Sequence, residues 1–133
     1  MSDLAEMLRL AATARENAHA PYSGFKVGVC LRSGDGRLFA GCNVENVSYP
    51  EGSCAETAAI GAMVTAGATE IAEVVVLAEG ERLCTPCGGC RQRLAEFGGP
   101  ETPVHVAGPQ GLRQTFTLGA LLPESFTFDA EGS

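Results

Sequence analysis

Two short cysteine motifs constrain this chain more than any other feature: Cys54-Ala55-Glu56 and Pro86-Cys87-Gly88-Gly89-Cys90. Each motif is expected at the start of a helix, directly after a loop or a strand. The partial positive charge at a helix N-terminus stabilises thiolates. A fold that brings these two helix starts together would therefore create a favourable site for a cation bound by three thiolates.

The residue types in the two motifs predict a catalytic zinc site. Cys54, Cys87 and Cys90 are the expected ligands of one Zn²⁺ ion per chain, and three protein ligands leave the fourth tetrahedral position open, as in catalytic zinc sites. Glu56 is the expected catalytic residue, a proton shuttle that does not bind the metal. The combination of C-x-E with P-C-x-x-C is typical of zinc-dependent deaminases.

Two alternatives compete with this interpretation. Ser53 and Glu56 also match a capping box, in which Glu56 would only satisfy the helix start. Cys84 could join the three ligand cysteines and close a structural four-thiolate site. Its place before Pro86, at the end of a predicted strand, and the lack of a second C-x-x-C pair disfavour the closed site.

The other cysteines and the histidines are expected to have no metal role. Cys30 and Cys42 fall in predicted strands, where free cysteines behave as small buried hydrophobes. His19 and His105 have no ligand-like spacing and are expected to be surface or cap residues.

Apolar periodicity and turn residues predict one mixed sheet covered by helices, an α/β domain. Helices are expected over 2–19, over 54–66 with Gly67 at the C-terminal end, and from Thr85-Pro86 to Phe97, with Pro86 at the first helical position. Strands are expected over 25–31, 37–43, 74–78 and 103–107, with 114–118 as a candidate fifth. The segment 33–36 is expected to be a hairpin turn, and 46–53 a loop.

Length and charge limit the function further. The 133 residues suit a single domain, 1–133. The net charge is −7, and the nine Lys and Arg residues are scattered, which disfavours a nucleic acid polymer as substrate. No apolar run is long enough for a membrane span, and no signal peptide is visible. We therefore expect a cytoplasmic protein that acts on a small molecule.

Asn43 and Glu45 form a polar pair at the end of the second predicted strand. Residues two apart in a strand face the same side, so an amide and a carboxylate would be presented together. Such a pair can bind the hydroxyl groups of a sugar. In isolation, the simpler interpretation is a polar strand end with Asn46 in a turn.

Over nearly its whole length the chain resembles the homotetrameric cytidine deaminases. The resemblance is carried by matching stretches in the same order and spacing: Ala20–Gly28, Asn43–Asn46, Ser48–Tyr49, Cys54–Glu56, Pro86–Gln92 and Leu121–Phe126. It implies a three-layer α/β/α sandwich around a mixed five-stranded sheet. It also implies hydrolytic deamination of cytidine and deoxycytidine in pyrimidine salvage.

The resemblance also implies roles for particular residues. Asn43 and Glu45 would hold the ribose, Phe25 would pack on the base, and Ala55 would contact the substrate. Tyr49 and Phe126 would complete active sites on neighbouring subunits of a homotetramer.

The chain departs from these relatives at two places. Many three-cysteine relatives carry Arg after the catalytic Glu, where it offsets the thiolate charge, whereas this chain has Thr57. Arg91 is the candidate substitute, and the alternative is a more negative site. The loop 50–53 also differs from the commoner version and is expected to influence tolerance for substituents on the base.

Three other functions are weighed against cytidine deamination. A deaminase of blasticidin S or another modified cytosine nucleoside is disfavoured by the Asn43 and Glu45 pair and by Phe126. A polynucleotide-editing deaminase is disfavoured by the net charge. A non-enzymatic structural zinc module is disfavoured by Glu56 beside an open coordination position.

Overall fold

The strands of the chain form one sheet in the order β2-β1-β3-β4-β5. A computed structural model describes residues 3–80 and 83–126. The strands are β1 (Val27–Ser33), β2 (Leu38–Cys42), β3 (Ile71–Ala78), β4 (Pro103–Gly108) and β5 (Gly111–Thr117). The β3–β4 pair is parallel and the other neighbouring pairs are antiparallel, so the predicted mixed five-stranded sheet is confirmed.

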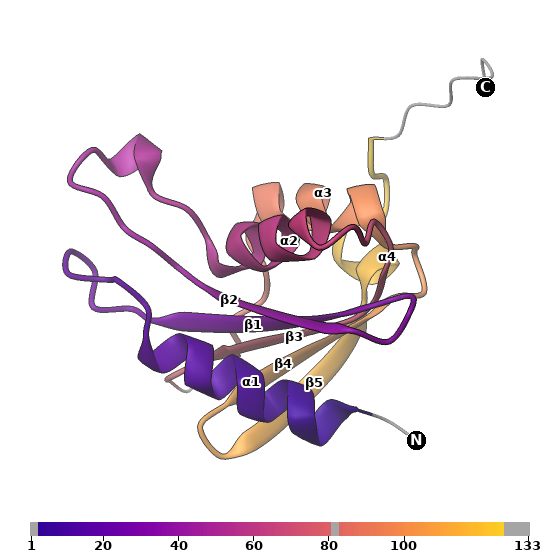
Figure 1. The fold of residues 1–133 in the computed structure, drawn as a ribbon, viewed down its shortest axis with the longest axis horizontal. Helices are drawn as coiled ribbons and strands as arrows, with labels where there is room; N and C mark the ends of the chain where they lie inside the picture. Colours follow the sequence, from indigo (N-terminus) through magenta and orange to yellow (C-terminus); the bar gives the residue numbers. More distant parts are fainter. Residues whose placement is uncertain (1–2, 81–82, 127–133) are drawn as a thin grey trace.

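Helices cover both faces of this sheet. Helix α1 (Leu4–Glu16) lies on one face, whereas α2 (Ala55–Thr65), α3 (Gly88–Phe97) and the short α4 (Leu118–Leu121) lie on the other (Figure 1). This arrangement confirms the predicted three-layer α/β/α fold. The loop before α2 contains a short 3₁₀ helix, η1 (Tyr49–Glu51). Within 3–80 and 83–126, no helix combines the length and the apolar character that a membrane span needs.

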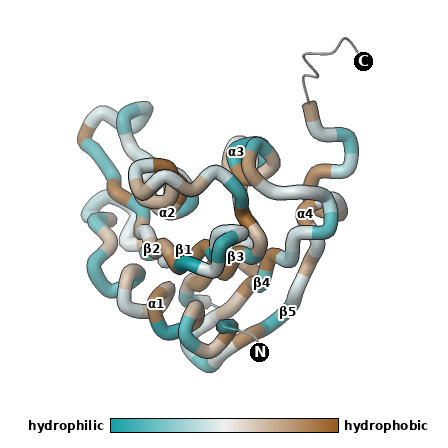
Figure 2. The backbone as a smooth tube through the Cα atoms, turned by 45° about the vertical axis from the view of Figure 1, so that its right-hand side comes forward, coloured by the Kyte–Doolittle hydropathy of each residue, from teal (hydrophilic) through white to brown (hydrophobic). Residues whose placement is uncertain are grey.

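The sheet is buried between two hydrophobic clusters. Alternation along β1 directs Val29 and Leu31 toward α2 and α3, and Cys30 toward α1. Strand β3 is apolar on both faces, as expected for a central strand. Along the tube of Figure 2, α1 alternates between hydrophilic and hydrophobic residues, in keeping with a helix that buries one side. Met7 and Ala11 form that buried side.

Two glycines let the helices approach the sheet closely. A Cβ atom on Gly28 would lie 1.9 Å from the carbonyl oxygen of Ala11 in α1. A Cβ atom on Gly41 would lie 2.5 Å from the backbone nitrogen of Ala59 and 2.8 Å from the carbonyl oxygen of Ala55. Any side chain at Gly41 would therefore push the first turns of α2 away from β2.

Several element boundaries differ from the predicted ones. Helix α1 ends at Glu16, and the predicted start at Ser2 lies outside the described residues. Strand β1 begins at Val27, so Phe25 precedes it in a loop. The first helical hydrogen bond of α3 runs from the backbone nitrogen of Arg91 to the carbonyl oxygen of Cys87, 2.9 Å, which makes Cys87 the N-cap. The predicted helix start at Thr85-Pro86 was therefore wrong.

The predicted fifth strand, 114–118, was misplaced. Strand β5 runs from Gly111 to Thr117, and Leu118 begins α4 instead. Most residues of β5 are exposed, and the polar residues 113–115 interrupt the apolar alternation that marks a strand in a sequence.

The expectation that His105 is a surface or cap residue was also wrong. His105 is buried on β4, where Nε2 lies 2.6 Å from Oε2 of Glu73 and Nδ1 lies 2.8 Å from the hydroxyl of Thr115. The guanidinium of Arg32 donates to the other oxygen of Glu73, at 3.0 Å. These contacts give the buried side chains of Glu73 and His105 hydrogen-bond partners on the α1 side of the sheet. His19 is exposed, as expected.

Candidate active site

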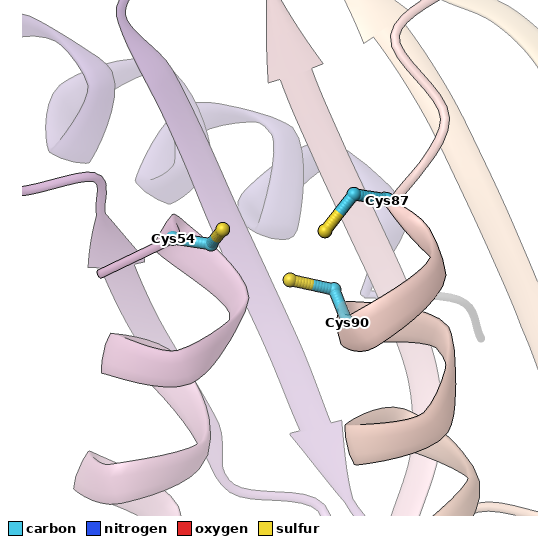
Figure 3. A group of neighbouring side chains, drawn as sticks. All are labelled: Cys54, Cys87 and Cys90. Atoms are coloured by element: carbon cyan, nitrogen blue, oxygen red, sulfur yellow. The ribbon is translucent and has the colours of Figure 1, made fainter. Parts of the chain in front are cut away.

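The starts of α2 and α3 converge on one face of the sheet and bring three cysteines together. Cys54 is the N-cap of α2, Cys87 is the N-cap of α3, and Cys90 lies in the first turn of α3. Their sulfur atoms all lie within 4.8 Å of one another and point into a common space (Figure 3). The three cysteines that the sequence predicts as ligands therefore lie together at two helix starts.

The donor set of this cluster fits zinc. Thiolates are preferred zinc ligands, and tetrahedral Zn–S bonds of about 2.3 Å imply sulfur separations of roughly 3.8 Å, which fall within the spacing of the cluster. Burial raises the pKa of the Cys54 and Cys90 thiols, and the negative charge of Glu56 raises both further. A bound dication reverses this preference because it favours the thiolate form.

Cys87 differs from the other two cysteines of the cluster. It is exposed, and a hydrogen bond from the backbone of Cys90 lowers the pKa of its thiol. Cys84 lies outside the three-cysteine group. The closed four-thiolate alternative therefore has no support in the geometry.

Glu56 is the buried carboxyl group of the site. It is the second residue of α2 and only 4% exposed. Burial raises the pKa of Glu56, while hydrogen bonds with its own backbone and with Cys90, together with the positive charge of Arg93, act in the opposite direction. A buried carboxyl group whose pKa is raised is typical of residues that act as general acids or bases.

The capping-box alternative for Glu56 is not found in the structure. The N-cap of α2 is Cys54 and not Ser53, and its side chain makes no capping hydrogen bond. The carboxyl group of Glu56 is instead directed toward the cysteine cluster, where its charge affects all three thiols.

A cavity of about 260 Å³ opens beside Glu56. Four predicted substrate-binding residues line it: Phe25, Asn43, Glu45 and Ala55. Cys54, Cys84 and Cys87 line it as well. The predicted catalytic group and the predicted sugar-binding pair therefore face one small space.

Asn43 and Glu45 are anchored to the loop that precedes β1. The amide of Asn43 donates to the carbonyl of Phe25 at 2.9 Å, and its oxygen accepts a hydrogen bond from the backbone nitrogen of Val27 at 2.8 Å. Asn43 was predicted to be the last residue of the second strand, but β2 ends at Cys42 and Asn43 follows it directly. Sequence reasoning gave these side chains a role in sugar binding but missed their structural role.

The carboxylate of Glu45 accepts hydrogen bonds from the backbone nitrogen atoms of Tyr22 and Ser23, at 2.9 and 3.1 Å, and from the Ser23 hydroxyl. The Ser23 hydroxyl is the main cause that lowers the pKa of Glu45, so this side chain remains ionised at neutral pH. Glu45 thus fixes one wall of the cavity while it presents a negative charge to it.

Tyr49 and Phe126 do not line this cavity. Tyr49 lines a neighbouring pocket of about 300 Å³ and makes an edge-to-face contact with Tyr22, with ring centroids 5.9 Å apart. Its side chain is 74% exposed. Phe126 is 76% exposed, and its carbonyl accepts a hydrogen bond from Gln92 at 3.1 Å. Within one chain, neither ring reaches Glu56.

Two arginines of α3, Arg91 and Arg93, contact different groups, and the sequence pointed only to Arg91. The guanidinium of Arg91 donates to the carbonyls of Pro86 and Leu121, at 2.7 and 2.8 Å, and to the hydroxyl of Thr85 at 3.0 Å. These hydrogen bonds hold Arg91 against the segment before Cys87. Contrary to the expectation from the sequence, Arg91 therefore does not reach the sulfur atoms. Arg93 was missed, although its spacing from Cys90 places both on one helix face.

Comparisons with known proteins agree with this site. The family model described as the cytidine and deoxycytidylate deaminase zinc-binding region matches residues 1–106. A cytidine deaminase of Halalkalibacterium halodurans is 39% identical over 121 residues, which cover 91% of this chain and 92% of that protein. A cytidine deaminase of Mycobacterium tuberculosis is 41% identical over 125 residues, with 92% and 90% covered.

Solved structures show the same fold. The crystal structure of the Burkholderia pseudomallei cytidine deaminase matches with a TM-score of 0.87 and 41% identity, over 95% of this chain and 100% of that one. That of the Mycobacterium tuberculosis cytidine deaminase matches with a TM-score of 0.82 and 37% identity, over 96% and 100%. The chain therefore belongs to the cytidine and deoxycytidylate deaminase family.

Proposed function

We propose that this chain is a zinc-dependent hydrolase that converts cytidine and deoxycytidine into uridine and deoxyuridine and releases ammonia. The observation that carries the proposal is the buried Glu56, which faces both the three-cysteine cluster and a cavity lined by Asn43 and Glu45. The family match supports the same reaction.

Cys54, Cys87 and Cys90 would hold the zinc ion. Zinc bound there would act as a Lewis acid and lower the pKa of a water molecule toward neutral pH. Glu56 accepts the proton of the water that adds to C4 of the base and delivers it to ring N3. It then carries the proton of the new C4 hydroxyl group to the exocyclic amino group, so that the C4–N bond breaks, ammonia leaves and the C4 carbonyl of the product forms.

The cavity walls would hold the nucleoside in place. The ionised Glu45 can accept hydrogen bonds from ribose hydroxyl groups, and the amide of Asn43 can donate or accept one. Phe25, which is 46% exposed, offers an aromatic surface for the base, and Ala55 lines the cavity beside Glu56. The free base cytosine lacks the sugar and is expected to be a poor substrate.

The test is an assay for ammonia release with cytidine, deoxycytidine, cytosine and blasticidin S. Glu56→Gln is the matched control, because it preserves size and helix propensity but cannot shuttle a proton. It should bind zinc as the wild type does and lose turnover by about 10³-fold or more. Turnover of blasticidin S alone would contradict the proposal, and so would a fully active Glu56→Gln variant.

The active enzyme is proposed to be a homotetramer with shared active sites. Tyr49 and Phe126 are exposed in the single chain, and large exposed aromatic side chains are typical of interfaces. Each would complete the cavity of a neighbouring subunit. We place the enzyme in the cytoplasm and in pyrimidine salvage, in keeping with a nucleoside substrate.

A complementation experiment tests the shared sites. Glu56→Gln and Phe126→Ala subunits should each be poorly active, but mixed tetramers would contain some sites with both residues intact. Unfolding and refolding the two variants together should therefore restore part of the activity. A fully active monomer in light scattering, or full activity of Phe126→Ala alone, would contradict the proposal.

A further inference from the structure

A zinc site with three thiolates has an uncompensated charge. Three thiolates and one dication sum to −1, and the buried carboxyl group of Glu56 adds further negative potential. Burial of net charge is unfavourable unless an opposite charge lies nearby. A cation close to the sulfur atoms would therefore stabilise the metal-bound form of the site.

Arg93 is the arginine that reaches the cluster. Its Nη1 atom lies 3.9 Å from Sγ of Cys90, one helical turn earlier on α3. In the part of the chain that the structure describes, no carboxylate forms an ion pair with Arg93. Its positive charge therefore acts on the carboxyl group of Glu56 and lies beside the sulfur of Cys90, whereas that of Arg91 is directed to backbone carbonyls.

Gly89 provides the space for this contact. A Cβ atom at Gly89 would lie 3.2 Å from Nη1 of Arg93, which is closer than an ordinary van der Waals contact. The absence of a side chain at Gly89 thus lets the guanidinium lie back over the first turn of α3, toward Cys90.

We propose that Arg93 acts through Cys90 as a positioning residue for zinc. Its guanidinium places a positive charge 3.9 Å from the sulfur of Cys90, where it offsets the −1 charge of a zinc ion with three thiolates and thereby strengthens metal binding. Thr57, at the start of α2, is uncharged, so the compensating charge of this chain is supplied from α3. This inference rests on the zinc site proposed above.

The test measures zinc affinity by competition with a chromophoric chelator, independently of catalysis. Arg93→Met and Arg93→Gln remove the charge but retain helix propensity, and each should weaken zinc binding about tenfold. Arg93→Lys, which restores a cation, should recover most of the affinity. Arg9→Met removes the same charge from exposed α1 on the other side of the sheet and should have no effect.

The outcomes separate this inference from the proposed function. If the wild type binds no zinc, both fail. If the wild type binds zinc and both neutral Arg93 variants bind it equally well, only the role of Arg93 fails. An Arg93→Lys variant as weak as Arg93→Met would also overturn it, because shape and not charge would then be the cause. Thermal unfolding monitored by circular dichroism verifies that each variant is folded.

Discussion

Ser23 and Glu45 are joined by two hydrogen bonds, one from the backbone nitrogen and one from the hydroxyl of Ser23 to the carboxylate. The same carboxylate lines the cavity beside Glu56. Glu45 therefore has two separable roles, as an anchor of the loop before β1 and as a proposed acceptor for the sugar.

Variants at these two positions should separate the two roles. Glu45→Ala should lower kcat/KM for cytidine and deoxycytidine by about 10- to 100-fold, because a charge-assisted hydrogen bond to substrate is lost. Ser23→Ala keeps the carboxylate and should cost less than about tenfold. Steady-state kinetics with both nucleosides measures this difference. Equal losses in the two variants would show that Glu45 only anchors the loop.

Metal content should follow the geometry of the cysteine cluster. We expect about one zinc ion per chain for a site with three thiolate ligands. Cys87→Ser should lose the metal, whereas Cys84→Ser should keep it, because Cys84 lies outside the three-cysteine group. Mass spectrometry of purified variants measures zinc per chain. Zinc loss in Cys84→Ser would favour the closed structural site.

The thiols of the zinc-free protein should react in a defined order as the pH rises. Alkylating agents react with thiolates, so a low pKa and exposure favour early reaction. Cys87 is exposed and has a lowered pKa, and it should be modified at the lowest pH. Burial raises the pKa of Cys30 to about 12, so this residue should stay unmodified at pH 8.

Peptide mapping after alkylation between pH 6 and 9 measures this order, and unfolded protein is the control in which all six cysteines react. Zinc should protect Cys87. Modification of Cys30 in the same pH range as Cys87 would be inconsistent with the structure.

A methyl group at Gly41 should disturb the site from a distance. The Cβ atom of Gly41→Ala would collide with the backbone of α2 near Ala55 and should destabilise the fold by about 1–3 kcal/mol. Zinc content should fall as well, because the same turn carries Cys54. Gly61→Ala is the matched control in α2. No atom lies within 4 Å of its new methyl group, so it should stabilise the fold by about 0.5–1 kcal/mol.

Urea unfolding of both variants measures the free energies, and zinc analysis measures the metal. If Gly41→Ala were as stable as Gly61→Ala and retained full zinc, the close approach of α2 to β2 would not be needed.

The sequence was most informative where local chemistry and structure coincide. The motifs at Cys54 and Cys87 combine ligand chemistry with a helix start, so they predicted that the cysteines meet at two helix starts, although α3 begins at Gly88 and not at Thr85-Pro86. Strand β3 was recognised by its continuous apolar run, although it begins at Ile71 and is longer than the predicted 74–78. Its first residues include the charged Glu73, which interrupts the apolar pattern but is satisfied by His105.

Features that depend on tertiary contacts could not be predicted in this way. The hydrogen bonds of Asn43 to the loop before β1 join segments that are distant along the chain. The close approach at Gly41 and the contact of Arg93 with Cys90 likewise become visible only when the helices are in place. The four-residue helix α4 is too short to show helical periodicity.

The hydrogen bonds of Asn43 and Glu45 also have a consequence for how substrate preference can diverge. The wall of the cavity formed by Ser23 and Phe25 is attached to residues that follow β2, whereas Glu56 and the cysteines belong to helix starts packed on the sheet. If this wall holds the nucleoside as proposed, substitutions at Ser23 or Phe25 are expected to change which nucleoside fits more than they change the cysteine cluster. The proposed recognition wall and the reaction centre meet at the segment after β2, where the backbone of Val44 pairs with that of Ser53, the residue before Cys54.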